Sequence, residues 1–304
     1  MISRKSPSAI TLNDFRSGMG KCFILSCTIK KVVILIILVL SVGNPIYAQN
    51  FKAKPQNITI SDPGKELNIG ETLEYSVEWL GIPVGRIVLK VEGITTINNY
   101  ECYHIIVKAL PNSFFQHLYD LEYTVHTYID KQFYYTRRFE KIRRINKQYN
   151  HIVIDFDQEK HKAVFFSEGF AALFKISPER NKIEANTPIT TEIPYGTQDL
   201  LSSFYYFRFL SMRENTSYPV NIYYNQRNWP VDMKVDKPFL KEIRKKGSFP
   251  VVKISPDSLL NNYILGKRRL IVYLTTDSHR IPLEFKLETA LGPISARIQN
   301  LTQK

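Results

Sequence analysis

The 304-residue sequence has few cysteines and lacks the common metal-binding patterns. Its three cysteines, Cys22, Cys27 and Cys102, form no Cys-x-x-Cys pair, and none of its six histidines belongs to a His-Glu-x-x-His pattern. A zinc centre built on either pattern is excluded, and we expect neither a metal nor a cofactor. One alternative stays open, because His104 and His126 lie in predicted strands and can meet across them.

The sequence also lacks two widespread catalytic signatures. No Gly-x-Ser-x-Gly turn surrounds Ser202, and the glycine spacing of a phosphate-binding loop is missing before Lys267. Asp155 and Asp157 lie two residues apart, on one face of a strand, where paired carboxylates can do glycosidase chemistry. A solvated strand edge produces the same spacing much more often. We assign no catalytic residue and take a non-enzymatic role as the main hypothesis.

Glycine is scarce, with 13 residues, whereas tyrosine and phenylalanine occur 18 times each. The hydrophobic content of 44% excludes a fully disordered chain. From residue 70 onward apolar and polar residues alternate, clearly at 73–79 and 121–129, which is the period of strands with one buried face. Few segments are long enough for crossovers. The sequence therefore predicts a mainly β fold with a large, curved antiparallel sheet.

One segment has a clear helical pattern, at residues 197–209. Thr197 can cap its first turn, and the charge of Asp199 suits the helix dipole there. Apolar side chains cover much of its circumference, which predicts that the helix packs against the sheet, with Ser202 as a small residue at the contact. Arg208 lies nine residues after Asp199, so the two are too far apart along one helix to pair. Each is expected to bind loop groups instead.

The first 48 residues have the composition of an export signal. Two lysines precede the apolar run of residues 32–42, and a small residue, Ala48, stands where cleavage would occur. Eleven helical residues are too short for a bilayer, which takes roughly 20. We expect a signal peptide over residues 1–48, with Met19 as an alternative start. Cleavage near Ala48 would place the chain in the periplasm or outer cell envelope; an uncleaved anchor is the alternative.

Cleavage would leave a polar linker at residues 49–69 and a single β-rich domain at 70–301. Cys102 alone would remain, so no internal disulfide could form. The first 48 residues carry six Lys/Arg and one Asp, which leaves 35 basic and 27 acidic residues, a net charge of +8. This charge favours a lipid, a lipoprotein or an acidic glycan as partner and is compatible with peripheral membrane contact. Export argues against nucleic acid.

The most basic segment, residues 137–147, holds six basic residues and one acid. Alternation predicts that Arg137, Lys141, Arg143 and Lys147 share one face, with Arg138 and Arg144 on the other. A strand charged on both faces cannot lie in a dry core. The favoured interpretation is a sheet edge, where charge discourages aggregation; the alternative is a wet concave surface that binds an anion. The candidate ligand-binding residues are Trp79, Arg137, Lys141, Arg143 and Arg208. For Trp79, packing near the rim is preferred to ligand stacking.

Three segments resemble a known family: GETLEYSVEWLGIPVG at 70–85, QDLLSSFYYFR at 198–208 and LTTDSHRIPL at 274–283. In this order they are similar to the bacterial family called domain of unknown function 3108, over about residues 70–301. Leu200 stands where the helix motif of that family often has proline. The resemblance implies an exported bacterial protein with a large antiparallel sheet, and it supplies no activity.

A sheet with one helix is also similar, in architecture alone, to the half-barrel lipoprotein carriers of the bacterial periplasm. The main hypothesis is therefore a non-enzymatic carrier or binding protein that holds an amphiphilic, lipidic or anionic envelope ligand. One alternative is an enzyme acting on envelope glycans or lipids, with candidates Asp155, Asp157, Asp199 and Asp277. The other is an assembly factor that binds another envelope protein.

Overall fold

The computed structural model describes residues 65–113, 121–146, 148–169, 187–244, 246–256, 269–289 and 292–302. The predicted signal peptide, Met19 and cleavage near Ala48 lie outside these residues, as does most of the predicted linker. The last residues of that linker are packed, since Leu67 is buried and the carbonyl oxygen of Lys65 accepts a hydrogen bond from the Tyr134 hydroxyl. Cys102 is a buried free thiol whose pKa is raised to about 12 by burial and by Asp130.

Fifteen strands form one sheet in the described part of the chain, and every ladder is antiparallel. The elements are β1 (Thr72–Trp79), β2 (Ile82–Ile97), β3 (Tyr100–Pro111), β4 (Leu121–Asp130), β5 (Thr136–Ile145), β6 (Gln148–Asp157), β7 (Lys162–Gly169), β8 (Ile189–Glu192), α3 (Leu200–Phe209), β9 (Thr216–Tyr224), β10 (Arg227–Val235), β11 (Phe239–Ile243), β12 (Gly247–Pro256), β13 (Arg269–Thr275), β14 (Pro282–Glu288) and β15 (Ile294–Thr302).

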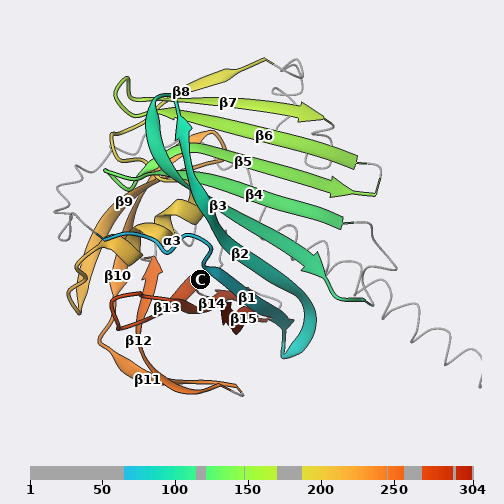
Figure 1. The fold of residues 1–304 in the computed structure, drawn as a ribbon, viewed down its shortest axis with the longest axis vertical. Coiled ribbons are helices and arrows are strands. Elements are labelled where there is room, and N and C mark those ends of the chain that lie inside the picture. The colour runs from blue at the N-terminus through green and yellow to red at the C-terminus, as the bar shows by residue number, and fades with distance from the viewer. Residues whose placement is uncertain are drawn as a thin grey trace, which may run out of the picture. The chain divides into compact units, whose positions relative to one another are not determined.

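The strand order is β8-β7-β6-β5-β4-β3-β2-β1-β15-β14-β13-β12-β10-β9, and β11 pairs with β12 (Figure 1). The predicted large antiparallel sheet is thus confirmed. The ladder from β1 to β15 joins the two halves of the sequence. No ladder among the described residues joins the end strands β8 and β9, so the sheet is not closed into a barrel.

Local sequence explains where strands turn. Asn98 and Asn99 have φ values of 49° and 70°, and they form the two-residue turn between β2 and β3. Asparagine tolerates this left-handed conformation, which matches the twist of a hairpin. β5 starts at Thr136, shortly after Tyr134, which also has a positive φ, of 59°.

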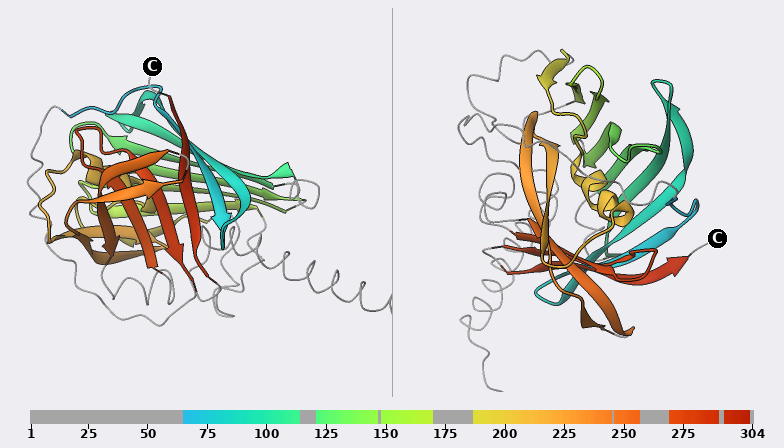
Figure 2. Two further views of the ribbon diagram at one scale, coloured as in Figure 1. Left: turned by 90° about the horizontal axis from the view of Figure 1, so that it is seen from below. Right: turned by 90° about the vertical axis from the view of Figure 1, so that its left-hand side faces the viewer.

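The helix α3 lies inside the curve of the sheet (Figure 2). Its N-cap is Asp199, whose carboxylate accepts hydrogen bonds from the backbone N–H groups of Leu201 and Ser202. The prediction that Thr197 caps the helix is wrong. The Thr197 hydroxyl instead donates to the carbonyl oxygen of Pro194. Among the described residues, no helix is long and apolar enough to cross a membrane.

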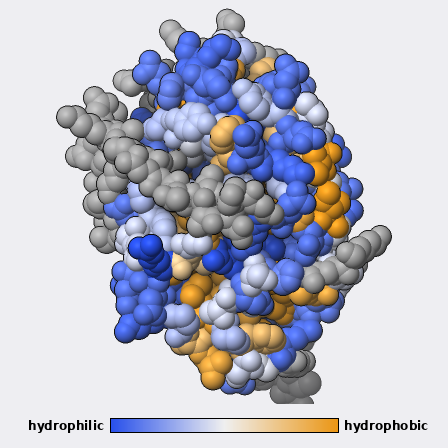
Figure 3. Space-filling model, turned by 60° about the vertical axis from the view of Figure 1, so that its left-hand side comes forward, coloured by the Kyte–Doolittle hydropathy of each residue, from blue (hydrophilic) through white to orange (hydrophobic). Residues whose placement is uncertain are grey.

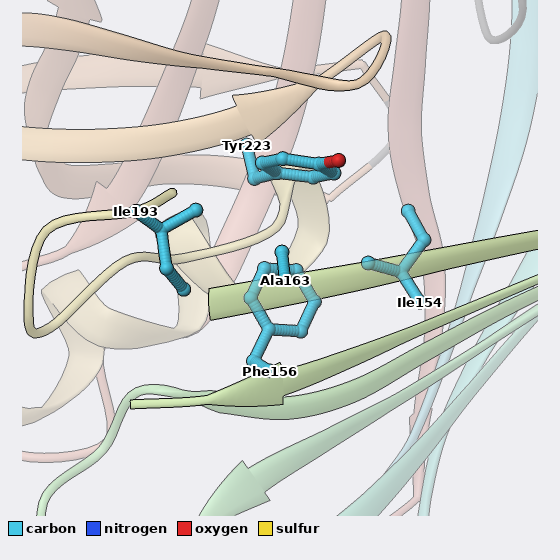
Figure 4. Packing of buried hydrophobic residues seen from close by; sticks show 5 residues of the cluster. All are labelled: Ile154, Phe156, Ala163, Ile193 and Tyr223. Carbon is cyan, nitrogen blue, oxygen red and sulfur yellow. The ribbon is translucent and has the colours of Figure 1, made fainter. Parts of the chain in front are cut away.

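The far ends of the sheet meet in a small hydrophobic cluster. Phe156 and Ala163, from β6 and β7, pack with Tyr223 from β9 and with Ile193 (Figure 4). The rings of Phe156 and Tyr223 meet edge to face with centroids 5.6 Å apart. Gln198 forms a parallel bridge to Ile222, so the segment that leads into α3 fills the space beside β9.

Candidate functional site

Strand side chains that contact Asp199, the N-cap of α3, show which face of the sheet lies against the helix. The Asp199 carboxylate accepts hydrogen bonds from the hydroxyls of Thr127 on β4, at 2.5 Å, and of Thr136 on β5, at 2.9 Å. We call this face the inner face. Residues directly opposite each other in a ladder share a face, and Val125 lies on the same face of β4 as Thr127. Lys141 is opposite Val125, so its side chain is also on the inner face.

Lys141 and Arg143 form a pair of cations two residues apart on this face, which we call the basic pair. Arg143 lies opposite Tyr123 on β4 and Asn150 on β6, and all three are buried. Lys141 is partly buried, opposite Val125 and Ile152. The cations therefore lie between two polar side chains and two aliphatic ones.

No carboxylate among the described residues lies within ion-pair distance of the basic pair. The other arginines of β5 differ in this respect, because each has an acidic partner. Arg138 contacts Asp155 at 2.5 Å, and Arg144 contacts Glu122 at 3.7 Å. Placing two like charges on a mostly buried surface without an anion is unfavourable. The basic pair is thus a site where an anion would be stabilised.

The pKa values of both cations are lowered, as expected for buried cations without a neighbouring anion. Burial, followed by the neighbouring charge of Arg143, lowers the pKa of Lys141 to about 8. Burial also lowers the pKa of Arg143. Burial and the nearby Tyr224 phenol raise the pKa of Tyr123, so its hydroxyl stays neutral at pH 7. A bound anion would reverse the shift at Lys141, because an opposite charge favours the charged amine.

The basic pair is in contact with solvent although it lies on the inner face. In the described part of the chain, two side-chain polar atoms are sealed from water and lack a hydrogen-bond partner, the hydroxyls of Tyr103 and Tyr205. The nitrogens of Lys141 and Arg143 are not among them, so water reaches these groups. A ligand headgroup could displace this water and hydrogen-bond to both cations.

Arg137 does not share the face of the basic pair, so the alternation predicted for residues 137–147 is wrong at this position. The ladder between β4 and β5 shifts register here, and Thr136 instead faces Asp199. Arg137 is buried in its own cluster, with its Nε atom 2.8 Å from Asp130 and its Nη1 atom 2.7 Å from Glu159. A bulge explains the difference, since an extra residue shifts the alternation of a strand.

β5 is not a sheet edge, so the favoured interpretation of the basic segment is also wrong. It pairs with β4 along one side and with β6 along the other. The charge on its outer face is balanced by ion pairs, whereas on the inner face Lys141 is only partly buried. Lys147, predicted to share the face of the basic pair, lies outside the described residues.

The structure separates Trp79 and Arg208 from the basic pair. Trp79 ends β1 in a partly exposed position, with β2, β3 and β4 between it and β5. Arg208 is buried and ion-paired with Glu71, and it is not grouped with Asp199, as predicted. Sequence reasoning missed Tyr123 and Asn150. Both lie on alternating strands, but only the register shows that they are opposite Arg143.

The four candidate carboxylates of the enzyme alternative have different partners. Asp155 contacts Arg138, and Asp157 contacts Lys160. Asp199 caps the helix, while Asp277 accepts hydrogen bonds within its own turn. They form no common site among the described residues.

His104 and His126 meet across β3 and β4 as predicted, with Nε2 and Nδ1 2.9 Å apart. Within the described ranges no group of three metal-ligating side chains is present.

The fold and the site define a protein with one open antiparallel sheet curled around a helix and a basic pair on the inner face. The family model "Protein of unknown function (DUF3108)" matches residues 74–299, and the chain belongs to this family. The resemblance found in the sequence is thereby confirmed. The chain is also similar to a crystal structure titled as a beta-barrel-like protein of domain of unknown function DUF1849 from Brucella abortus. That similarity has a TM-score of 0.49 and 10% identity, and it covers 78% of this chain and 98% of the other. No curated protein matches the sequence.

Proposed function

We propose that the protein is a non-enzymatic binding or carrier protein for an anionic amphiphile, held on the inner face of its sheet. The observation that supports this proposal is the basic pair. Lys141 and Arg143 are mostly buried, contact solvent and have no acidic partner among the described residues, unlike the other arginines of β5. An anionic headgroup would neutralise both charges.

The neighbours of the pair favour an amphiphile over a small inorganic anion. Val125 and Ile152 flank Lys141 in the two adjacent ladders, and Phe139 precedes it on the same face. These side chains offer an apolar surface to an acyl chain. On the other side Tyr123 and Asn150 offer polar groups beside Arg143. The Asn150 amide already donates to the Ser167 hydroxyl at 3.2 Å, which holds it in place.

The proposal includes an extracytoplasmic location, in the periplasm or outer envelope, which rests on the export signal expected from the sequence. A carrier that works there would take up its ligand from a membrane or a lipoprotein. Bacterial envelopes are rich in anionic lipids, and fatty acids and phospholipids carry the combination of headgroup charge and acyl chain that the site requires.

The test compares binding of oleate and of the uncharged lipid monoolein to the full chain, purified from the cell envelope and delipidated. The double variant Lys141→Met/Arg143→Met removes both charges at similar volume. The matched control is Arg138→Gln/Arg144→Gln, on the opposite face of the same strand. We expect the first variant to bind oleate about 10- to 100-fold more weakly, the range for loss of charge-assisted hydrogen bonds. The control should bind as the wild type does.

Two results would overturn the proposal. One is oleate affinity that is the same in the wild type and in the Lys141→Met/Arg143→Met variant. The other is monoolein affinity that equals oleate affinity in the wild type, since the cations would then contribute nothing. Native mass spectrometry of the protein before delipidation would identify a co-purified ligand, which we expect to be an acidic lipid.

A further inference from the structure

The hairpin formed by β11 and β12 combines an exposed leucine near its open end with a basic turn. β11 pairs with β12 alone, from Phe239 opposite Val251 to Ile243 opposite Gly247. Leu240 is 73% exposed and is the most exposed large hydrophobic residue in the described part of the chain. Phe239 is on the other side of β11, where its ring meets that of Tyr273 edge to face. Figure 1 shows the hairpin at the lower end of the sheet, extending away from α3.

One side of the hairpin is anchored on the sheet. Ile243 is buried, and the Lys241 amine lies 2.8 Å from Glu284 on β14 and 3.9 Å from the centre of the Tyr273 ring on β13. Leu240 is on the opposite side of β11, because neighbouring residues of a strand point to opposite faces. The anchored side holds the strand in place, so the exposure of Leu240 is a feature of the fold.

Both ends of β11 carry positive charge, Lys237 before the strand and the turn after it. Residues 237–250 contain five basic residues and one acid, Glu242. Lys237, Arg244 and Lys246 are exposed, and none of them has an ion-pair partner among the described residues. Figure 3 shows hydrophobic residues gathered at the lower end of the molecule, the end at which β11 and β12 lie in Figure 1.

We propose that this hairpin docks the protein on an anionic lipid surface, with Leu240 inserted between headgroups and Lys237, Arg244 and Lys246 bound to them. Exposed apolar side chains flanked by cations bind such surfaces through combined burial and charge. The composition favours lipid over protein, because lysine is depleted at protein interfaces and one narrow hairpin falls short of the roughly 800 Å² that each partner of a stable complex buries.

The test is sedimentation of the full chain with vesicles of phosphatidylcholine alone or mixed with phosphatidylglycerol. We expect binding to the anionic vesicles, release at high salt, and little binding to phosphatidylcholine. Leu240→Ser should weaken the binding about tenfold, and each of Lys237→Gln and Lys246→Gln about fivefold. The matched control is Ile94→Ser, which alters an exposed apolar residue, 41% exposed, on the β2–β3 hairpin.

The proposal is overturned if Leu240→Ser sediments as the wild type does, or if Ile94→Ser weakens binding equally. Equal sedimentation with both kinds of vesicle would also overturn it. The Lys141→Met/Arg143→Met variant separates this inference from the proposed function. It should retain vesicle binding while it loses oleate binding, because its substitutions are on the inner face and leave the hairpin intact.

Discussion

Arg208 on α3 and Glu71, just before β1, form a buried bidentate ion pair across 137 positions of sequence. The Arg208 Nη1 and Nη2 atoms lie 2.6 and 2.9 Å from the two carboxylate oxygens of Glu71. The Arg208 Nε atom also donates to the carbonyl oxygen of His279, at 3.2 Å. The pair ties the end of the helix to the strand that joins the two halves of the sheet, and both side chains are almost fully shielded from water.

Breaking this pair should destabilise the protein strongly. Arg208→Met leaves the Glu71 carboxylate buried without a cation, so we expect a loss of about 3–5 kcal/mol in the free energy of unfolding. The double variant Glu71→Gln/Arg208→Met should lose less, because it leaves no unpaired charge. Urea denaturation followed by circular dichroism measures both. A double variant that is less stable than Arg208→Met would contradict this account.

The His104–His126 pair should make stability depend on pH. Burial lowers the pKa of both side chains from the ordinary value of 6.5, and His126 lowers that of His104 further, against the opposing effects of Glu92 and Glu140. The unfolded chain then binds protons first as the pH falls. The stability contributed by the pair is therefore present above about pH 6.5 and is lost as the pH falls towards the lower, folded-state pKa values.

Urea denaturation at about pH 7.5 and pH 5.5 tests this expectation, since the two values bracket the ordinary histidine pKa. The variant His104→Gln/His126→Gln should lose less stability between these values than the wild type does. His279→Gln is the control, because His279 is exposed and its side chain is not part of the pair. An identical pH dependence in the wild type and the double variant would refute the prediction.

Lys141 should show a pH dependence at alkaline values. Its pKa is about 8 when folded, against an ordinary 10.5, so the unfolded chain binds the additional proton between these values. Stability without ligand should therefore rise as the pH increases from about 8 to about 10.5, and oleate affinity should fall over the same range. At pH 7 Lys141→Met should be more stable than the wild type by about 1–3 kcal/mol.

The control for this measurement is Lys162→Met, an exposed lysine on β7. We expect its stability to vary with pH as that of the wild type does. Should Lys141→Met retain the alkaline rise in stability, the charge responsible lies elsewhere.

Alternation along the sequence predicts most of the strands, because each strand buries one face, and it places Lys141 and Arg143 on one face correctly. Alternation does not predict the order of the strands in the sheet, because that order depends on contacts between distant segments. The basic strand β5 could therefore be mistaken for an edge. Alternation also fails at Arg137, where a bulge depends on the partner strand β4.

The helix α3 was also predicted only in part. Local composition predicts that the helix exists and that it is buried. It does not predict the N-cap, because threonine and aspartate are both favourable N-cap residues. Asp199 is the N-cap in the structure, where the hydroxyls of Thr127 and Thr136 also hold its carboxylate. These hydroxyls belong to strands more than 60 residues away. The site residues Tyr123 and Asn150 escaped prediction for the same reason.

The bridge between Gln198 and Ile222 also bears on what the end strand β9 can offer to a strand of another chain. The backbone N–H of Gln198 donates to Asn221, and that of Tyr223 donates to Gln198, so part of the outer side of β9 is already bonded within the chain. At the opposite end of the sheet, β8 has only four residues. A strand from another chain would therefore find backbone groups of β9 already hydrogen-bonded, and at the other end only the short strand β8 to pair with. Open sheets invite intermolecular growth, and here backbone bonds at one end and a short strand at the other leave few backbone groups for it.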